Sequence, residues 1–215
     1  AIVATALTDG DVLTLTGAND ATISFDEGDI TASAYTGGLT VTGTGTAGQF
    51  TTGTASSSIS STGTTAIVAT ALADGQTLTT TGNGALTITG LQANLAVNDA
   101  RSAAHSVTAA AVANLTVAMG TSTSGTDTIV ATALTDGQVL TLTGSNSTNL
   151  SFANGDITAS AFAGALAVTG SGTTGQFTTG VASSSISSTG ATAIVATALA
   201  DDQTLTTSGA GATTI

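Results

Sequence analysis

The sequence predicts an all-β protein, a repetitive β-solenoid (β-helix), with tandem β-sandwich repeats as the alternative fold. A short phrase returns at a nearly fixed spacing, apolar and polar residues alternate over short runs, and Gly, Asn and Asp residues separate those runs. A fixed period is the signature of a stacked repeat architecture. Short alternation indicates half-buried strands.

The phrase Ile-Val-Ala-Thr-Ala-Leu-x-Asp-Gly opens the chain and returns at nearly equal intervals, at Ile2–Gly10, Ile67–Gly75, Ile129–Gly137 and Ile194–Asp202, where Asp202 replaces the glycine. We therefore divide the chain into repeat unit 1 (1–65), a diverged unit 2 (66–127), unit 3 (128–192) and a partial unit 4 (193–215). Residues 2–88 and 129–215 are near copies with a shift of 127. Because the chain starts and stops within a repeat, we expect it to belong to a longer repetitive protein.

A solenoid is favoured over a sandwich because tandem units pack on their neighbours in a quasi-one-dimensional stack. The predominantly small side chains would also fill poorly the gap of ~10 Å between two packed sheets. With about 20 residues per coil, each unit would hold about three coils and the chain about ten, giving a rod about 50 Å long at ~4.8 Å per coil.

Alternating apolar residues mark the expected strands, at Leu13/Leu15, Ile23/Phe25, Leu39/Val41, Ile59, Ile67/Leu72, Leu78 and Leu86/Ile88. Thr, Val and Ile favour strands because branching at Cβ restricts χ1. The chain has no proline, which would remove a donor from a strand ladder. Residues 98–113 are ambiguous. Their alanine content permits a short helix, whereas the alternation in Ser106–Thr108 favours a strand, which we prefer.

The charge balance excludes several classes of partner. The net charge is −12, with one arginine (Arg101), one histidine (His105) and no lysine. Nucleic-acid binding requires Lys and Arg to neutralise phosphates, and an anionic membrane surface would repel this chain. The absence of cysteine excludes a disulfide scaffold, a zinc-thiolate site and thiol catalysis. We therefore expect no nucleic-acid partner and no membrane insertion.

Two acidic clusters, Asp9-Gly10-Asp11 and Asp26-Glu27-Gly28-Asp29, are candidates for Ca²⁺, which takes six to eight oxygen ligands. In the other units Asp11 is replaced by Gln76, Gln138 and Gln203, and Asp26-Glu27 by Ala153-Asn154. A ligand set that disappears between near copies is not expected to be structural. We therefore predict no metal and no cofactor, with Ca²⁺ as the alternative. The recurring aspartates are interpreted as turn formers: Asp29, Asp156, Asp9, Asp74, Asp136 and Asp201.

His105, Asp99 and the many serines raise the question of a hydrolase triad. No nucleophile-elbow motif surrounds any serine, and the histidine lies in the diverged unit. We therefore predict no catalytic residue, no cofactor-binding residue and no enzymatic activity. Arg101 is expected to pair with Asp99 or with an acidic residue of another chain.

The segments Ala71–Gly82 and Leu86–Leu91 resemble repeats of giant bacterial type I-secreted surface proteins, the adhesins and RTX-associated surface-layer proteins. The resemblance implies an extracellular, non-enzymatic protein with an all-β fold. The RTX calcium nonapeptide Gly-Gly-x-Gly-x-Asp is absent, because Gly37-Gly38 is followed by Leu39 and no aspartate. Calcium binding is therefore not implied.

We expect an extracellular, cell-surface structural protein, a building block of a bacterial filament, surface layer or adhesin stalk that self-associates end to end or laterally. The alternative is a ligand-binding adhesin or an ice-binding module. Glycan or cell-surface contact would need clustered aromatic side chains. Ice binding would need a Thr-x-Thr pair on almost every coil, and the motif occurs at Thr14–Thr16, Thr40–Thr42, Thr87–Thr89 and Thr141–Thr143.

Overall fold

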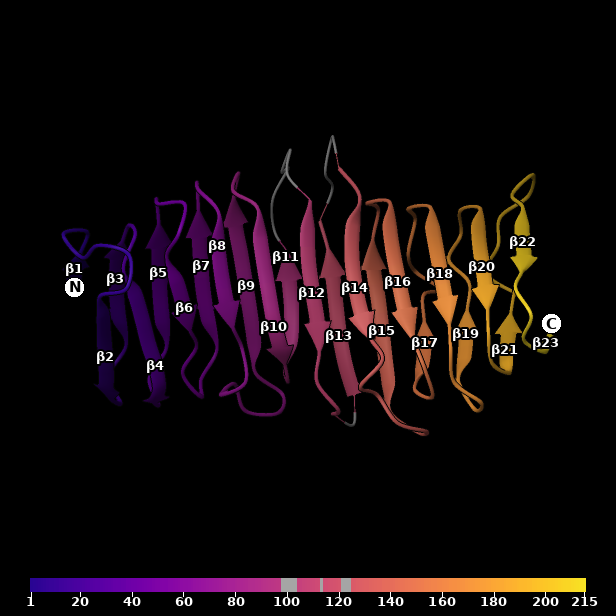
Figure 1. Cartoon of the computed structure of the whole chain (residues 1–215), viewed down its shortest axis with the longest axis horizontal. Helices are drawn as coiled ribbons and strands as arrows, with labels where there is room; N and C mark the ends of the chain where they lie inside the picture. Colours follow the sequence, from indigo (N-terminus) through magenta and orange to yellow (C-terminus); the bar gives the residue numbers. More distant parts are fainter. Residues whose placement is uncertain (98–103, 113, 121–124) are drawn as a thin grey trace.

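The computed structural model describes residues 1–97, 104–112, 114–120 and 125–215. Within these residues all regular secondary structure is β-strand, from β1 to β23, and neighbouring strands pair in parallel (Figure 1). After each strand the chain crosses to the opposite sheet, so two strands complete one turn. The molecule is therefore a β-solenoid, as predicted from the sequence.

The odd-numbered strands form a 12-stranded sheet and the even-numbered strands an 11-stranded sheet, which we call the odd sheet and the even sheet. The odd sheet contains β1 (Ile2–Ala4), β3 (Ala21–Phe25), β5 (Leu39–Gly43), β7 (Ser57–Ser61), β9 (Thr77–Gly82), β11 (Asn94–Val97), β13 (Asn114–Met119), β15 (Val139–Gly144), β17 (Asp156–Thr158), β19 (Gln176–Thr178), β21 (Thr192–Val195) and β23 (Thr213–Thr214). The even sheet contains β2 (Val12–Gly17), β4 (Asp29–Tyr35), β6 (Gln49–Thr51), β8 (Thr65–Val68), β10 (Leu86–Leu91), β12 (His105–Ala109), β14 (Asp127–Ala131), β16 (Thr148–Phe152), β18 (Leu166–Gly170), β20 (Ser184–Ser188) and β22 (Leu205–Ser208).

The turns of the solenoid, called coils above, vary in their number of residues around the expected value of about 20. Leu78 pairs with Leu95 across a short turn, whereas Val117 pairs with Leu142 across a long one. With one strand of each turn in each sheet, the chain makes about eleven turns rather than ten. At ~4.8 Å per turn the stack is roughly 50 Å long.

The number of turns per repeat unit differs from the expectation. The four copies of the phrase begin on β1, β8, β14 and β21, which lie in the odd, even, even and odd sheet. The first and third steps of the phrase therefore span seven strands, or three and a half turns, and only the shorter second step spans the expected three turns. The shift of 127 spans 13 strands, so the two near copies lie on opposite sheets. Both faces of the rod consequently carry the same sequence pattern, related by a half turn and a translation.

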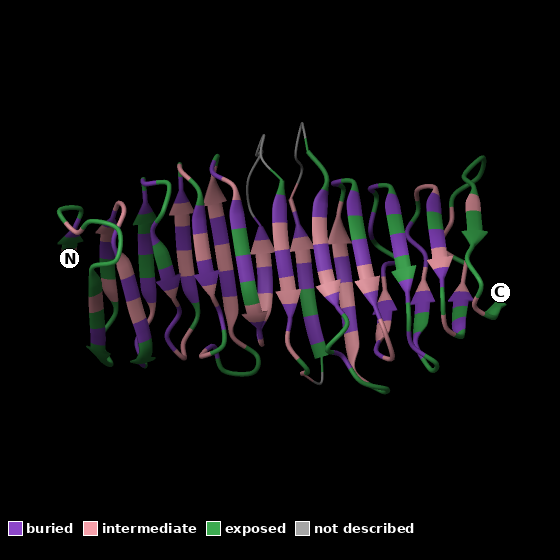
Figure 2. Cartoon of the chain, viewed as in Figure 1, coloured by how far each residue is buried: buried purple, intermediate pink, exposed green. Residues whose placement is uncertain are grey.

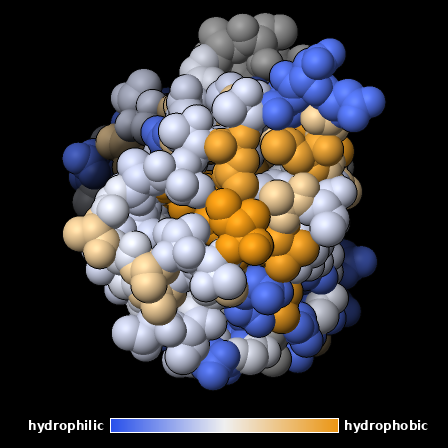
Figure 3. Space-filling view, turned by 90° about the vertical axis from the view of Figure 1, so that its right-hand side faces the viewer, coloured by the Kyte–Doolittle hydropathy of each residue, from blue (hydrophilic) through white to orange (hydrophobic). Residues whose placement is uncertain are grey.

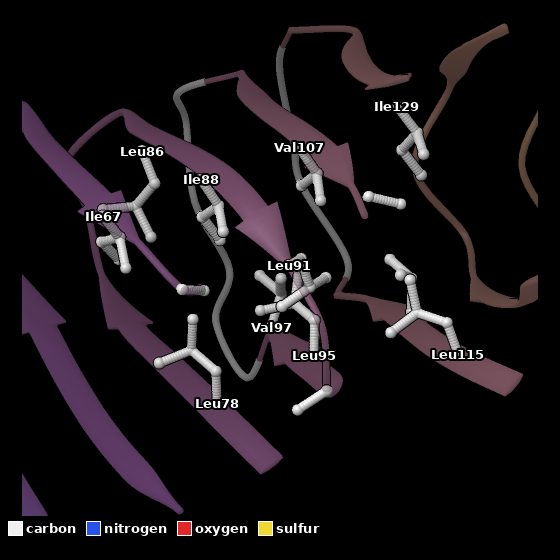
Figure 4. Packing of buried hydrophobic residues seen from close by; sticks show 14 of the residues in the cluster. Ile67, Leu78, Leu86, Ile88, Leu91, Leu95, Val97, Val107, Leu115 and Ile129 are labelled. Atoms are coloured by element: carbon white, nitrogen blue, oxygen red, sulfur yellow. The ribbon is translucent and has the colours of Figure 1, made fainter. Parts of the chain in front are cut away.

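The core is a continuous apolar column between the two sheets, and buried residues recur on the strands from one end of the rod to the other (Figure 2). In Figure 4 Ile67 and Ile88 of the even sheet point toward Leu78 and Leu95 of the odd sheet. The column is bulkier than the small side chains of the sequence suggested, because all five phenylalanines are fully buried in it: Phe25, Phe50, Phe152, Phe162 and Phe177. Large rings therefore help to fill the gap that small side chains alone would leave.

The ambiguous stretch 98–113 contains β12, which pairs with β10 and β14. The strand interpretation is confirmed for His105–Ala109, and no helix occurs in the described part of this stretch. Residues 98–103, which include Asp99 and Arg101, lie outside the described residues, as does residue 113.

The first and last turns each have one side that no further turn of this chain covers. Ile2, Leu7 and Leu13 are only partly buried in the first turn. In the last turn Leu205 is partly buried and Ile215 is 73% exposed. Figure 3 shows apolar residues gathered at the centre of the end that holds the C-terminus.

Candidate functional site

The outer faces of the two sheets are the candidate functional surfaces. Because successive turns stay in register, outward side chains align in columns parallel to the rod axis, with ~4.8 Å between neighbours in a column. Alternate residues of one strand belong to adjacent columns, because side chains two apart point to the same side.

Four strands of the odd sheet, β3, β5, β7 and β9, carry a hydroxyl at every position of two adjacent columns. The first column contains Thr22, Thr40, Ser58 and Thr79, and the second contains Ser24, Thr42, Ser60 and Thr81. We call this set of side chains face 1. All are exposed or half-buried and none is charged.

The near copy of face 1 lies on the opposite side of the rod, on β16, β18, β20 and β22 of the even sheet. Its columns contain Asn149, Ala167, Ser185 and Thr206, and Ser151, Thr169, Ser187 and Ser208. We call this second set of side chains face 2. They are also uncharged and at least partly exposed.

A trough follows the first column of each face. The trough of face 1, about 280 Å³ in volume, is lined by residues that include Gly38, Thr40 and Ser58. The trough of face 2, about 390 Å³, includes the copies of these residues, Ala165, Ala167 and Ser185. Every residue that lines the first trough has its copy in the second. The duplication therefore places a similar trough on both sides of the rod, although Asp20, Gly38 and Thr40 are replaced by Ser147, Ala165 and Ala167.

The recurring aspartates of β4 and β17 connect successive turns. The Asp29 carboxylate accepts a hydrogen bond from the backbone N–H of Gln49 (3.0 Å), and Asp156 accepts one from Gln176 (3.1 Å). Each acceptor lies 20 residues before its donor, on the preceding turn. The interpretation of these two residues as turn formers was therefore incomplete, because they also satisfy backbone donors of the next turn.

Glu27 in the acidic cluster of unit 1 has the same role. Its two carboxylate oxygens accept hydrogen bonds from the backbone N–H groups of Thr46 and Ala47, both at 3.1 Å. In the near copy Asn154 replaces it and accepts from the N–H of Thr173 at 2.9 Å. A carboxylate and an amide both supply an acceptor oxygen, which explains why the charge at this position is dispensable.

Asp11 stabilises the tight local turn that Thr8 and Asp11 enclose. Its carboxylate accepts hydrogen bonds from the backbone N–H and the hydroxyl of Thr8, at 2.9 and 2.8 Å, and these bonds lower the pKa of Asp11 below its ordinary value. Its copy Gln138 accepts from the N–H of Thr135 at 2.8 Å. The described residues contain no group of three or more His, Cys, Asp or Glu side chains that could hold a metal ion.

A buried polar cluster beside His105 was not predicted from the sequence. Asp127 is fully buried and accepts hydrogen bonds from the backbone N–H of His105 and from Nδ2 of Asn146, both at 2.8 Å. In two other units the equivalent position is a buried threonine, Thr65 or Thr192, hydrogen-bonded to a serine hydroxyl. When the repeat units are aligned, Asp127 stands at the position of these threonines. This replacement is the feature of the sequence that could have indicated the buried polar cluster.

The structure separates the four Thr-x-Thr motifs named above and buries the aromatic side chains. Two Thr-x-Thr motifs lie on the even sheet, in β2 and β10, and two on the odd sheet, in β5 and β15, so these motifs do not follow one another on successive turns. All six aromatic residues are buried, Tyr35 with 6% exposure and the phenylalanines with at most 1%. An exposed aromatic platform for a glycan is therefore not formed.

Comparisons with known proteins supply no relative. A scan against models of protein families finds no match, and neither does a search of curated proteins or of solved structures. Among the described residues no helix is long and apolar enough to cross a membrane. The solenoid and its two faces are therefore the basis for a functional proposal.

Proposed function

We propose that the chain is a structural element of a bacterial cell surface: a stiff, self-associating rod in a filament, a surface layer or an adhesin stalk. The observation that supports this most directly is the unbroken stack. Each sheet runs from the first turn to the last, and every strand except those at the ends pairs on both edges. A quasi-one-dimensional stack of this kind gives length and rigidity with few kinds of residue.

Three sets of contacts act together along the rod axis. Backbone ladders join each strand to the next turn, side-chain oxygens such as those of Asp29 and Glu27 satisfy further backbone donors, and the apolar column packs turn on turn. Bending or stretching the rod must disrupt all three at once, so neighbouring turns are expected to move as one body.

The composition supports a location outside the cell. The resemblance of Ala71–Gly82 to repeats of secreted surface proteins points there, and the single arginine with no lysine leaves trypsin-like proteases one cleavage site. A surface rod exposed to proteases would benefit from such a composition.

The test is self-association of the purified chain across a concentration series. Sedimentation velocity and negative-stain electron microscopy should show single rods at low concentration and extended assemblies at high concentration. Monomers at every concentration up to the solubility limit would contradict a self-associating structural role. Turnover of a polysaccharide by the monomer would replace that role with an enzymatic one.

A further inference from the structure

We propose that the buried pair Asp127 and Asn146 specifies which turn stacks on β14, and so keeps strands of nearly equal sequence from pairing with the wrong copy. The wrong pairings are β16 on β8 and β10 on β14, formed when two copies of the chain exchange strands. This inference goes beyond the proposed function and does not depend on it.

Strands β8 and β14 offer almost the same surface to the strand that follows them in the even sheet. Both carry the Ile-Val-Ala part of the phrase, Ile67–Ala69 in β8 and Ile129–Ala131 in β14. In the native pairing Ile88 of β10 lies opposite Ile67, and Leu150 of β16 lies opposite Ile129. The backbone ladder and the apolar contacts therefore distinguish poorly between the two pairings.

The number of stacked turns does not distinguish between them either. One exchanged rod would contain β1 to β9 of one chain and β16 to β23 of the other, and so lose three turns. The second rod would contain the remaining strands and gain three turns. The total number of turns is unchanged, so stacking alone gives no preference. Exchange of this kind is a characteristic misassembly of repeat proteins, and only the contacts where exchanged strands meet oppose it.

The residues at one inner corner differ between the two places. Asp127, at the start of β14, accepts hydrogen bonds from Nδ2 of Asn146 on the next turn and from the backbone N–H of His105 on the preceding turn, both at 2.8 Å. Thr65, its equivalent in β8, is hydrogen-bonded at 2.8 Å to Ser61 of its own turn. The corresponding sets on three successive turns are His105–Asp127–Asn146, Gly48–Thr65–Gly84 and Gly175–Thr192–Gly211.

Both exchanged pairings are unfavourable at this corner. If β16 stacked on β8, Asn146 would take the place of Gly84, where a Cβ would lie 1.7 Å from the carbonyl oxygen of Gly63. The backbone would have to move, and the Asn146 amide would lose its carboxylate acceptor. If β10 stacked on β14, Gly84 would leave the fully buried Asp127 carboxylate without its side-chain donor, which is strongly unfavourable for a buried charged group.

The pair acts on the choice of partner rather than on folding as such. A rod with one mismatched corner still folds, because its other turns stack as before. Buried polar contacts are well suited to select one register among several with similar apolar packing. In a chain built from near copies, such a contact marks one position along the rod as different from the others.

Single cysteines report which strands have paired. Asn149 of β16 lies opposite Thr128 in the native structure, and would lie opposite Ala66 only if β16 paired with β8. Ala66 and Asn149 are four strands apart in the even sheet of one molecule, about 19 Å, which is too far for a disulfide.

The experiment mixes an isotope-labelled Asn149→Cys chain with a chain that carries either Ala66→Cys or Thr128→Cys. The two chains are unfolded together in urea, refolded at high concentration and oxidised. Mass spectrometry then quantifies the covalent heterodimers. A disulfide between positions 128 and 149 reports exchange with native pairing, and one between positions 66 and 149 reports exchange with the wrong copy.

The wild-type background should give the 66–149 disulfide at no more than about a tenth of the 128–149 yield, because the mismatched corner disfavours the wrong pairing. With Asp127→Thr and Asn146→Gly in both chains, the corner has the residues of the near copies, and the 66–149 yield should rise at least about tenfold. Leu150→Ala is the control for lost stability, because it shortens a buried side chain of β16 and leaves the polar pair intact. Its 66–149 yield should stay low. Circular dichroism confirms that each variant is folded.

Three results would overturn the proposal. The first is a 66–149 yield equal to the 128–149 yield in the wild-type background. The second is no rise in the Asp127→Thr, Asn146→Gly chain, including the case in which neither disulfide forms there. The third is an equal rise in Leu150→Ala, which would assign the effect to stability in general. Self-association of the folded rod is measured separately, so each of these results leaves the proposed function standing.

Discussion

At the scale of single residues, acceptor oxygens rather than charges explain the acidic composition. Asp29 and Glu27 accept hydrogen bonds from backbone donors of the next turn, and Asn154 does so in the near copy. Alignment of the copies showed that charge is dispensable there. It did not show the cross-turn contacts, because the partners lie one full turn away at positions fixed only by the register.

The buried carboxylate of Asp127 should be important for stability. Asp127→Ala removes the acceptor for the His105 N–H and the Asn146 amide inside the core. Loss of an acceptor for buried donors should lower the free energy of unfolding by about 2–4 kcal/mol. Urea denaturation measures the loss, with the outward-facing Thr128→Ala as the control. A loss below about 0.5 kcal/mol, in the range of ordinary surface substitutions, would contradict this role.

Asp202 should make the folded chain less stable than a glycine at the same position would. It has φ 62°, in the left-handed region, where the other copies of the phrase have Gly10, Gly75 and Gly137. Asp202→Gly should raise the free energy of unfolding by about 0.5–1 kcal/mol, and the reverse change Gly137→Asp should lower it by a similar amount. Thermal melting of the two variants checks the pair. Shifts of the same sign in both variants would exclude a backbone explanation.

At the scale of strands, alternation predicted elements such as β2, β3, β5 and β10, and single apolar residues, Ile59 and Leu78, marked β7 and β9. Strand β6 was not predicted because it is short. Strand β4 was not predicted because the register is irregular there, so that Ile30 and Tyr35 are both buried although an odd number of positions separates them. The sequence also did not predict that the two near copies of the repeat lie on opposite sheets. Turn lengths vary along the chain and therefore hide the number of strands per unit.

One corner between strands requires close contact of backbones. A Cβ on Gly63 would lie 1.8 Å from the carbonyl oxygen of Gly45 on the preceding turn, whereas a Cβ on Gly75 would meet nothing within 4 Å. Gly63→Ala should therefore displace the backbone of a neighbouring turn and lower the free energy of unfolding by more than about 3 kcal/mol. Gly75→Ala should lower it by about 1–2 kcal/mol through its positive φ alone. Equal losses in the two variants would show that the corner is not tightly stacked.

At the scale of the whole molecule, the stability of the stack is expected to be approximately a sum of contributions from single turns and from the contacts between neighbouring turns. A deletion of residues 67–128 joins Ala66 to Ile129, so that one even-sheet copy of the phrase replaces another. Because three full turns are lost, the sheets stay in phase, and the chain should fold into a rod about 14 Å shorter. Circular dichroism and small-angle X-ray scattering test this deletion. An unfolded product would contradict independent stacking of turns.

The two faces illustrate the limit of sequence reasoning at this scale. Alternation predicted the strands, but which outward residues become neighbours depends on the separate length of each turn between β3, β5, β7 and β9. Only this register places Thr22, Thr40, Ser58 and Thr79 in one column. The location of the copied face on the opposite side of the rod depends in turn on the odd number of strands that separates the two copies.

The central claim, that the chain stacks turn on turn along one axis, is tested most directly by spin-label distances in one column of the even sheet. The chain has no cysteine, so labels can be attached to single engineered pairs. With one label at Thr14, partners at Thr89, Val130, Thr169 and Ser208 lie 4, 6, 8 and 10 strands further along the sheet. Electron paramagnetic resonance should give distances that rise linearly, at about 19, 29, 38 and 48 Å. Distances that level off or fall with increasing strand number would show that the repeats fold back on one another, and the solenoid account would be wrong.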